Sequence, residues 1–160
     1  MLTFTVHGVA QHKGSMRAYV PRGMKFPIVT DSNRNARSWA QLVAEGANRV
    51  LNERDNVLLE QGPVRVEIIF YLPRPKKYAK KPDAAHVTAP DVDKLSRGVL
   101  DALTSVAYVD DSQVVELLAY KRYAAIGEIP RARITVEHFA AVPLFDTLAN
   151  PEAVPCKASC

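Results

Sequence analysis

Two acidic pairs stand out in the chain, because carboxylates that lie close together bind divalent cations. They are Asp91-x-Asp93 and Asp110-Asp111, separated by a segment of helical spacing. Carboxylates that converge on one spot repel each other unless a cation compensates. Mg²⁺ binds a few carboxylates and keeps several waters, which leaves positions for a phosphate oxygen and an attacking water. The pairs therefore fit a metal-dependent hydrolytic site; the alternative is that they serve only as a helix cap, a turn and a polar loop.

The elements around the acidic pairs follow from proline and from apolar spacing. Pro90 favours extended backbone before it and is tolerated only at the start of a helix, so we expect residues 87–92 to be extended and Asp93 to be an N-cap. A three- to four-residue apolar period then predicts a helix ending near Thr104-Ser105. A short strand over 106–109 would deliver the second acidic pair. The apolar positions of this helix are Leu95, Val99, Leu103 and Val106.

The rest of the chain predicts an α+β fold, a two-layer domain with a mixed β-sheet and two main helices. Residues 64–72 alternate with apolar residues on both faces, which indicates a central strand. Residues 140–160 lack a period and read as an extended C-terminal tail after a domain at 1–139, packing on a partner through Leu144 and Phe145. We expect further strands at 2–7, 114–123 and 131–139, a helix at about 34–54, and loops at 11–26 and 73–89.

Charge is distributed unevenly along a chain of net charge +4. Lysine and arginine cluster in residues 1–37 and 73–97, the second cluster running into the first acidic pair. Basic clusters beside carboxylates suit a polyanion held over a metal site, and the alternative is a solvated basic surface. From these clusters we expect DNA contacts at Lys13, Arg17, Lys76, Lys77 and Lys94.

Several classes of protein are excluded by what the sequence lacks. No apolar run approaches the length of a membrane span, and no phosphate-cradling glycine pattern indicates a nucleoside triphosphatase. The N-terminus alternates like a strand and shows no signal peptide. Both cysteines, Cys156 and Cys160, fall at the end of the chain, which suits a reducing, cytoplasmic location and no zinc site.

The acidic stretch has the pattern Pro-Asp-x-Asp-Lys-Leu-x-Arg-x-x-Leu-Asp-Ala-Leu-Thr from residue 90, followed by Tyr-x-Asp-Asp-Ser-Gln-Val-Val from residue 108. This pattern resembles the signature of the RusA family of Holliday junction resolvases. The match is dense over residues 90–121 and weaker over about 2–139. The resemblance implies a dimeric, bacterial or phage-encoded endonuclease that uses Mg²⁺, with Mn²⁺ as an alternative, to nick four-way DNA junctions.

The resemblance also assigns roles to single residues. It places the metal-binding catalytic aspartates at Asp91, Asp93 and Asp111, and the catalytic basic residue at Arg97. Lys94 stands where the family commonly has asparagine, and Arg97 where it commonly has lysine. Arginine keeps the charge but cannot lose a proton, so it would clamp a phosphate rather than act as a base. Lys121 also matches a basic position of the family, so we expect a DNA contact there as well. Asp110 and Asp101 stay outside the catalytic set.

Two other functions remain open from the sequence. One is a non-catalytic DNA-binding recombination accessory protein whose carboxylates are structural. The other is a metal nuclease of the Pro-Asp…(Asp/Glu)-x-Lys type beginning at Pro90-Asp91, which ranks low because no convincing acid-x-lysine follows on a strand.

Overall fold

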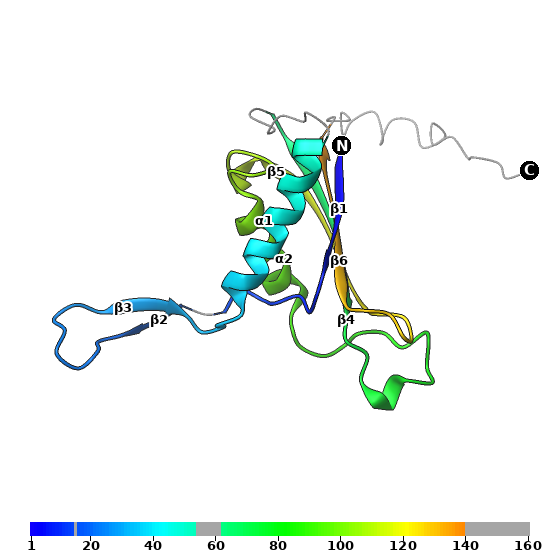
Figure 1. The fold of residues 1–160 in the computed structure, drawn as a ribbon, viewed down its shortest axis with the longest axis horizontal. Helices are drawn as coiled ribbons and strands as arrows, with labels where there is room; N and C mark the ends of the chain where they lie inside the picture. The colour runs from blue at the N-terminus through cyan, green and yellow to red at the C-terminus, as the bar shows by residue number, and fades with distance from the viewer. Residues whose placement is uncertain (15, 54–61, 140–160) are drawn as a thin grey trace, which may run out of the picture.

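Two helices cover one face of a four-stranded sheet in the computed structural model, which describes residues 1–14, 16–53 and 62–139 (Figure 1). The strand order is β1-β6-β4-β5; β4 and β5 are parallel, and the other neighbouring pairs are antiparallel. The expected α+β fold with a mixed sheet is confirmed. The elements are β1 (Leu2–His7), α1 (Ala36–Glu53), β4 (Val64–Leu72), α2 (Val92–Leu103), β5 (Val114–Tyr123) and β6 (Arg131–His138).

The core lies between the sheet and the helices, and β4 runs through its centre. Alternate residues of β4, from Val64 to Leu72, are buried beneath the helices, as the predicted central strand requires. Helix α1 packs closely on β1 at Gly46, where a Cβ would lie 3.0 Å from the Phe4 ring. Helix α2 buries Leu95, Val99 and Leu103, the residues whose spacing predicted it.

Two predictions around α2 were wrong in detail. The helix begins at Val92 with Asp91 as its N-cap, so Asp93 lies in the first turn. The strand expected over 106–109 is instead a tight turn, closed by a bond from the Ser105 N–H to the Tyr108 carbonyl at 2.7 Å. Ser105 takes a left-handed φ of 62°, which reverses the chain and turns Ala107 and Tyr108 into the core.

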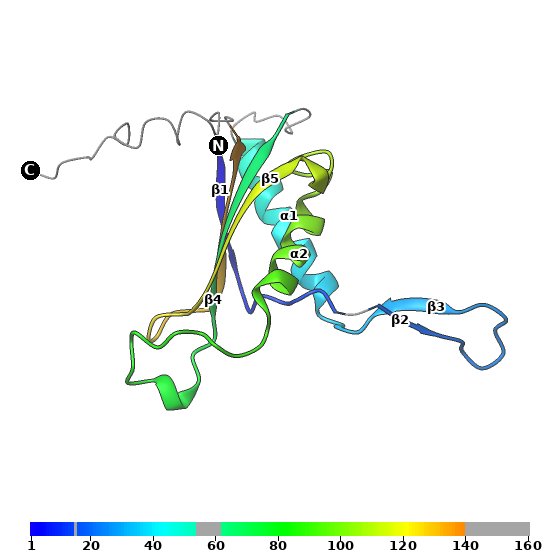
Figure 2. The ribbon, with the colours of Figure 1, turned by 180° about the vertical axis from the view of Figure 1, so that it is seen from behind.

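The first basic loop, predicted over residues 11–26, contains secondary structure that the sequence pattern did not indicate. Strands β2 (Met16–Tyr19) and β3 (Ile28–Asp31) pair as an antiparallel hairpin that projects from the body in both views (Figures 1 and 2). The predicted loop at 11–26 was therefore wrong from Met16 to Tyr19. The second loop contains a short 3₁₀ helix, η1 (Lys76–Tyr78), and another, η2 (Asp111–Gln113), precedes β5.

Some predictions fall outside the described residues. These are the tail at 140–160 with Leu144, Phe145 and both cysteines, and the end of the first helix at residue 54. Over the residues that are described, none of the helices combines the length and apolar character needed to span a bilayer.

Candidate functional site

The N-terminal end of α2 presents two exposed carboxylates. Asp91 is the N-cap but its side chain accepts no capping bond, and Asp93 follows in the first turn. The helix dipole favours negative charge at this end. The Lys94 ammonium lies 2.9 Å from the Asp91 carboxylate, and this bond, with the positive charge behind it, lowers the pKa of Asp91. The Asp91 carboxylate is therefore ionised at neutral pH and exposed to solvent.

The segment that leads into the β2–β3 hairpin, residues 11–13 or the hairpin root, contacts the first turn of α2. The Lys13 N–H donates to the Lys94 carbonyl at 3.2 Å. A Cβ at Gly98 would lie 3.4 Å from the Gln11 carbonyl oxygen, so glycine permits the close passage of this segment over the helix. A pocket beside it is lined by His12, Ala89, Pro90, Asp91 and Lys94.

Lys121, on β5, holds the backbone that leads into the acidic motif. Its ammonium donates to the Thr88 carbonyl at 2.7 Å and to the Pro90 carbonyl at 2.8 Å. Both carbonyls lie just before Asp91, so the lysine fixes the chain at the point where α2 begins. Lys121 was predicted as a DNA contact. In the structure its ammonium donates hydrogen bonds within the chain, and a phosphate contact there stays a prediction.

The second basic loop is organised by Arg74, a residue that sequence reasoning passed over. Its guanidinium donates to the carbonyls of Ala124 at 3.0 Å, Lys81 at 2.6 Å and Pro82 at 3.2 Å. An arginine binding backbone carbonyls has no signature in sequence, since any residue supplies the acceptors. The loop is thereby shaped so that Lys76 and Lys77 are exposed, as phosphate contacts require.

An aromatic cluster packs beneath this loop. The His86 ring centroid lies 4.4 Å from that of Tyr123, which in turn lies 5.4 Å from that of Tyr78. Burial, followed by the nearby Lys121 charge, lowers the pKa of His86 below its usual range. His86 is thus favoured as a neutral packing residue rather than a charged DNA contact.

The second acidic pair lies near the C-terminal end of α2, and its members differ in their surroundings. Asp110 caps η2, and its carboxylate accepts from the Ser112 N–H at 2.9 Å. Hydrogen bonding from the Ser112 side chain, followed by that from its backbone, lowers the pKa of Asp110. Asp111 is exposed. Burial raises the pKa of the Tyr108 hydroxyl, and the negative charges of Asp111 and Asp101 add to the effect.

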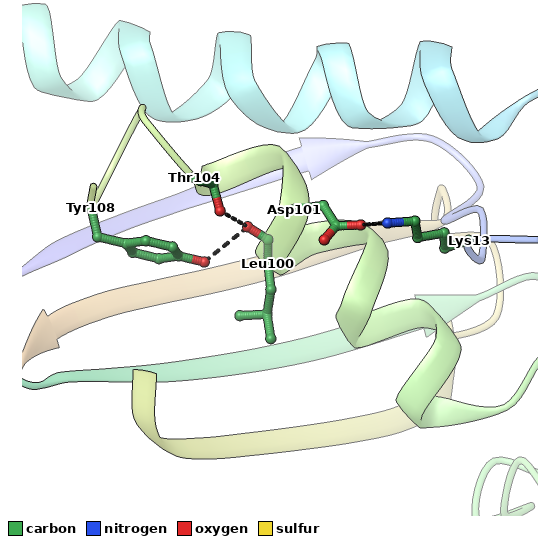
Figure 3. Close-up of polar contacts among 5 residues, drawn as sticks. All are labelled: Lys13, Leu100, Asp101, Thr104 and Tyr108. Atoms are coloured by element: carbon green, nitrogen blue, oxygen red, sulfur yellow. Dashed lines mark hydrogen bonds and ion pairs between the residues drawn. The ribbon is translucent and has the colours of Figure 1, made fainter. Parts of the chain in front are cut away.

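Polar contacts fix this end of α2 (Figure 3). The Leu100 carbonyl accepts from the Tyr108 hydroxyl at 3.0 Å and from the Thr104 hydroxyl at 3.2 Å. The next residue after Leu100, Asp101, forms an ion pair with Lys13. Lys13, predicted to contact DNA, is therefore partly neutralised within the chain.

The three predicted metal ligands do not meet within one chain. Helix α2 has 12 residues, which at 1.5 Å per residue is about 18 Å. Asp91 and Asp93 lie at its start, whereas Asp111 follows the turn beyond its other end (Figure 2). Over residues 1–14, 16–53 and 62–139, no three His, Cys, Asp or Glu side chains are grouped so as to hold a metal. Arg97 is exposed on α2 between the two ends.

Comparison with known proteins connects this geometry with a family. The family model for endodeoxyribonuclease RusA matches residues 10–137, from the hairpin root to the end of β6. The chain belongs to the RusA family. The RusA match contains both basic segments, all of α2 and both acidic pairs, and it confirms the resemblance seen in the motif.

A curated relative extends the likeness over nearly the whole chain. The uncharacterized protein YqaN of Bacillus subtilis (strain 168) is 30% identical over 149 residues, which are 88% of this chain and 98% of that protein. Its name states no activity, so the assignment to an endodeoxyribonuclease family rests on the family match.

Proposed function

We propose that this RusA-family protein is a Mg²⁺-dependent endonuclease that resolves four-way DNA junctions by paired symmetric nicks. The observation that carries the proposal is the pair of exposed carboxylates at the start of α2, flanked by the hairpin root and by the segment that leads from the second basic loop. Phosphate contacts from the basic segments would supply affinity without reading sequence.

Asp91 and Asp93 fit a magnesium ion by their chemistry. Mg²⁺ is commonly held by one or two carboxylates, with waters and substrate phosphates in the remaining positions. When bound, the ion would lower the pKa of an attacking water and neutralise charge on the phosphate. Lys94 keeps Asp91 ionised, Lys121 fixes the backbone before it, and Arg97, one turn along the helix, would clamp a phosphate oxygen.

Asp111 would complete the site from a second copy of the chain. A two-fold axis perpendicular to α2 near its midpoint makes the two copies of the helix antiparallel. Asp91 and Asp93 of one copy then face the end of α2 that carries Asp111 in the other. Such a dimer has two equivalent sites, which suits the approximate two-fold symmetry of a four-way junction.

A cleavage assay tests the activity. Labelled four-way junction and matched linear duplex are incubated with wild type or Asp93→Asn, with Mg²⁺ or with chelator. We expect paired symmetric nicks in the junction alone, with metal alone, and none in the variant. Tight junction binding without cleavage by wild type would favour the accessory-protein function, and equal cutting of linear duplex would remove the junction specificity.

Mixing two inactive variants tests the shared site. In a mixed dimer of Asp93→Asn and Asp111→Asn chains, one shared site carries both substitutions and the other carries neither. We expect single-strand nicking to return on mixing and refolding the two inactive variants together. If each site lies within one chain, every site in the mixture is damaged and no activity returns.

A further inference from the structure

The projecting hairpin carries a concentration of apolar side chains that nothing in the described chain covers. Phe26 is 79% exposed, Met24 57% and Tyr19 53%, and Val20 and Ile28 are exposed beside them. Hydrophobic side chains that gather on a surface in this way mark a contact with a partner. A two-stranded hairpin is also only marginally stable alone, so a partner would add to its order.

The hairpin has a defined end. The Met24 N–H donates to the Pro21 carbonyl at 3.0 Å, closing a turn in which Gly23 takes a φ of 91°. Such a positive φ at the third turn position requires glycine or asparagine. Tyr19 pairs with Ile28 across the two strands, so the exposed apolar side chains continue from the strands to the turn.

Charge indicates which partner fits. Arg22 and Lys25 lie within the exposed end, and residues 12–30 contain no aspartate or glutamate. A second hairpin of the same charge would be repelled, whereas a polyanion would be attracted. Aromatic side chains interleaved with basic ones form the usual surface for unstacked nucleic-acid bases.

We propose that the hairpin end stacks on the bases exposed at the branch point of a DNA junction; this rests on the proposed function. In the interior of a linear duplex every base is stacked between neighbours, whereas the base pairs at the branch point of an open junction expose a face. Phe and Met side chains are among those that proteins insert at opened base steps. The backbone contacts elsewhere bind any duplex, so the hairpin would be the part that recognises shape.

The hairpin root determines where the hairpin lies relative to the carboxylates of α2. The Lys13 to Lys94 backbone bond and the close passage at Gly98 hold the hairpin on the turn of α2 that carries Asp93. Strands of four residues extend about 13 Å from that point. A hairpin seated at the branch point would thus set how far from the crossover the carboxylates meet the backbone.

The test compares Phe26→Ala with two controls, Phe26→Trp and Ile129→Ala. Trp preserves an aromatic surface, and Ile129 is an exposed apolar residue outside the hairpin. Dissociation constants for four-way junction and linear duplex are measured in chelator, with 2-aminopurine at the branch point as a stacking probe. We expect Phe26→Ala to weaken junction binding about tenfold, to change duplex binding less than twofold, and to lose the probe signal, while both controls behave as wild type.

Three outcomes would overturn the hairpin proposal. The first two are that Phe26→Ala keeps the wild-type preference for junction over duplex, or that it loses affinity equally for both. The third is that light scattering shows a dimer for the wild type and a monomer for Phe26→Ala, which would make the hairpin a subunit contact. Wild-type cleavage is measured in parallel with Mg²⁺. Absence of that cleavage rejects the proposed nuclease alone, because the binding comparison in chelator does not depend on it.

Discussion

The two ends of α2 each carry a pair of acidic residues, yet their surroundings differ. At the start, Asp91 and Asp93 are both exposed, and Lys94 and Lys121 order the charge and the backbone around them. At the other end, Asp110 and Asp111 are both exposed, but the Asp110 carboxylate is bonded as the cap of η2. Acidic residues close in sequence thus have different tasks, decided by the hydrogen bonds that each one makes.

In the proposed dimer, a short helix separates the two halves of each site. The first end supplies two carboxylates and a fixed backbone, and the second supplies one carboxylate on a rigid 3₁₀ turn. Each half would be ordered before the second copy binds, which would reduce the entropy lost when the halves combine. Substitutions at the two ends therefore test whether the two halves act together.

The largest effect is expected from Asp111→Asn. If this residue completes a shared site, junction cleavage falls at least about 100-fold, as for loss of a principal charge in a catalytic site. Junction binding persists, because the carboxylate repels phosphate rather than attracting it. Gel cleavage and gel-shift assays on one preparation separate the two effects. Cleavage within twofold of wild type would make the second acidic pair structural and leave the first end to act alone.

A smaller effect is expected from Lys121→Met at the first end. Loss of its bonds to Thr88 and Pro90 frees the backbone before Asp91, and a misplaced ligand lowers kcat roughly 10- to 100-fold. Lys76→Met is the matched control, since it removes the same charge from an exposed position. The control should instead lower the slope of log affinity against log salt by about one. A reduced slope for Lys121→Met with unchanged kcat would make Lys121 a phosphate contact.

Asp110→Ala should act on stability rather than on chemistry. It removes the cap of η2, and we expect the Tm to fall by a few degrees for a chain of this size. Asp110→Asn keeps a capping oxygen and should retain the wild-type Tm. Calorimetry of the two variants, with cleavage measured below the transition, checks the assignment. If Asp110→Asn retains its Tm but loses cleavage, Asp110 belongs with Asp111 in the site.

The smallest effect is expected at His86, beneath the second basic loop. Its folded pKa lies below its unfolded value, so the unfolded chain binds more protons and stability rises with pH. The contribution is complete above about pH 6.5 and is lost as pH falls toward the folded pKa. His86→Phe keeps a ring against Tyr123 and removes the titration. Urea unfolding from pH 7.5 to 5 should show a flatter free energy of unfolding in the variant; parallel curves would assign the loss to other groups.

The sequence predicted the elements that have a hydrophobic period and missed those set by single hydrogen bonds. The sheet strands and α2 follow from alternation and helical spacing, because burial enforces both. The β2–β3 hairpin was not predicted, because its exposed apolar residues have no buried face that would impose a hydrophobic period. The strand expected before Asp110 failed because one left-handed residue, Ser105, reversed the chain.

The candidate site was likewise only partly predictable from the sequence. A motif identified Asp91, Asp93 and Asp111 as candidate ligands, but the place of Asp111 beyond the far end of α2 depends on the turn at Ser105, which spacing alone does not give. Arg74 and the internal bonds of Lys121 act through backbone carbonyls, which every residue carries, so sequence has no pattern for them.

The fixed length of α2 has a consequence for how this chain tolerates insertions. One residue added within the helix would move its far end by about 1.5 Å and rotate it by about 100° relative to the start. The buried face formed by Leu95, Val99 and Leu103 would be broken, and in the proposed dimer the two halves of a site would no longer face each other across the two-fold axis. By contrast, the loop around η1 has no such requirement. Gaps should therefore collect in that loop and be absent between Asp93 and Leu103 among functional relatives.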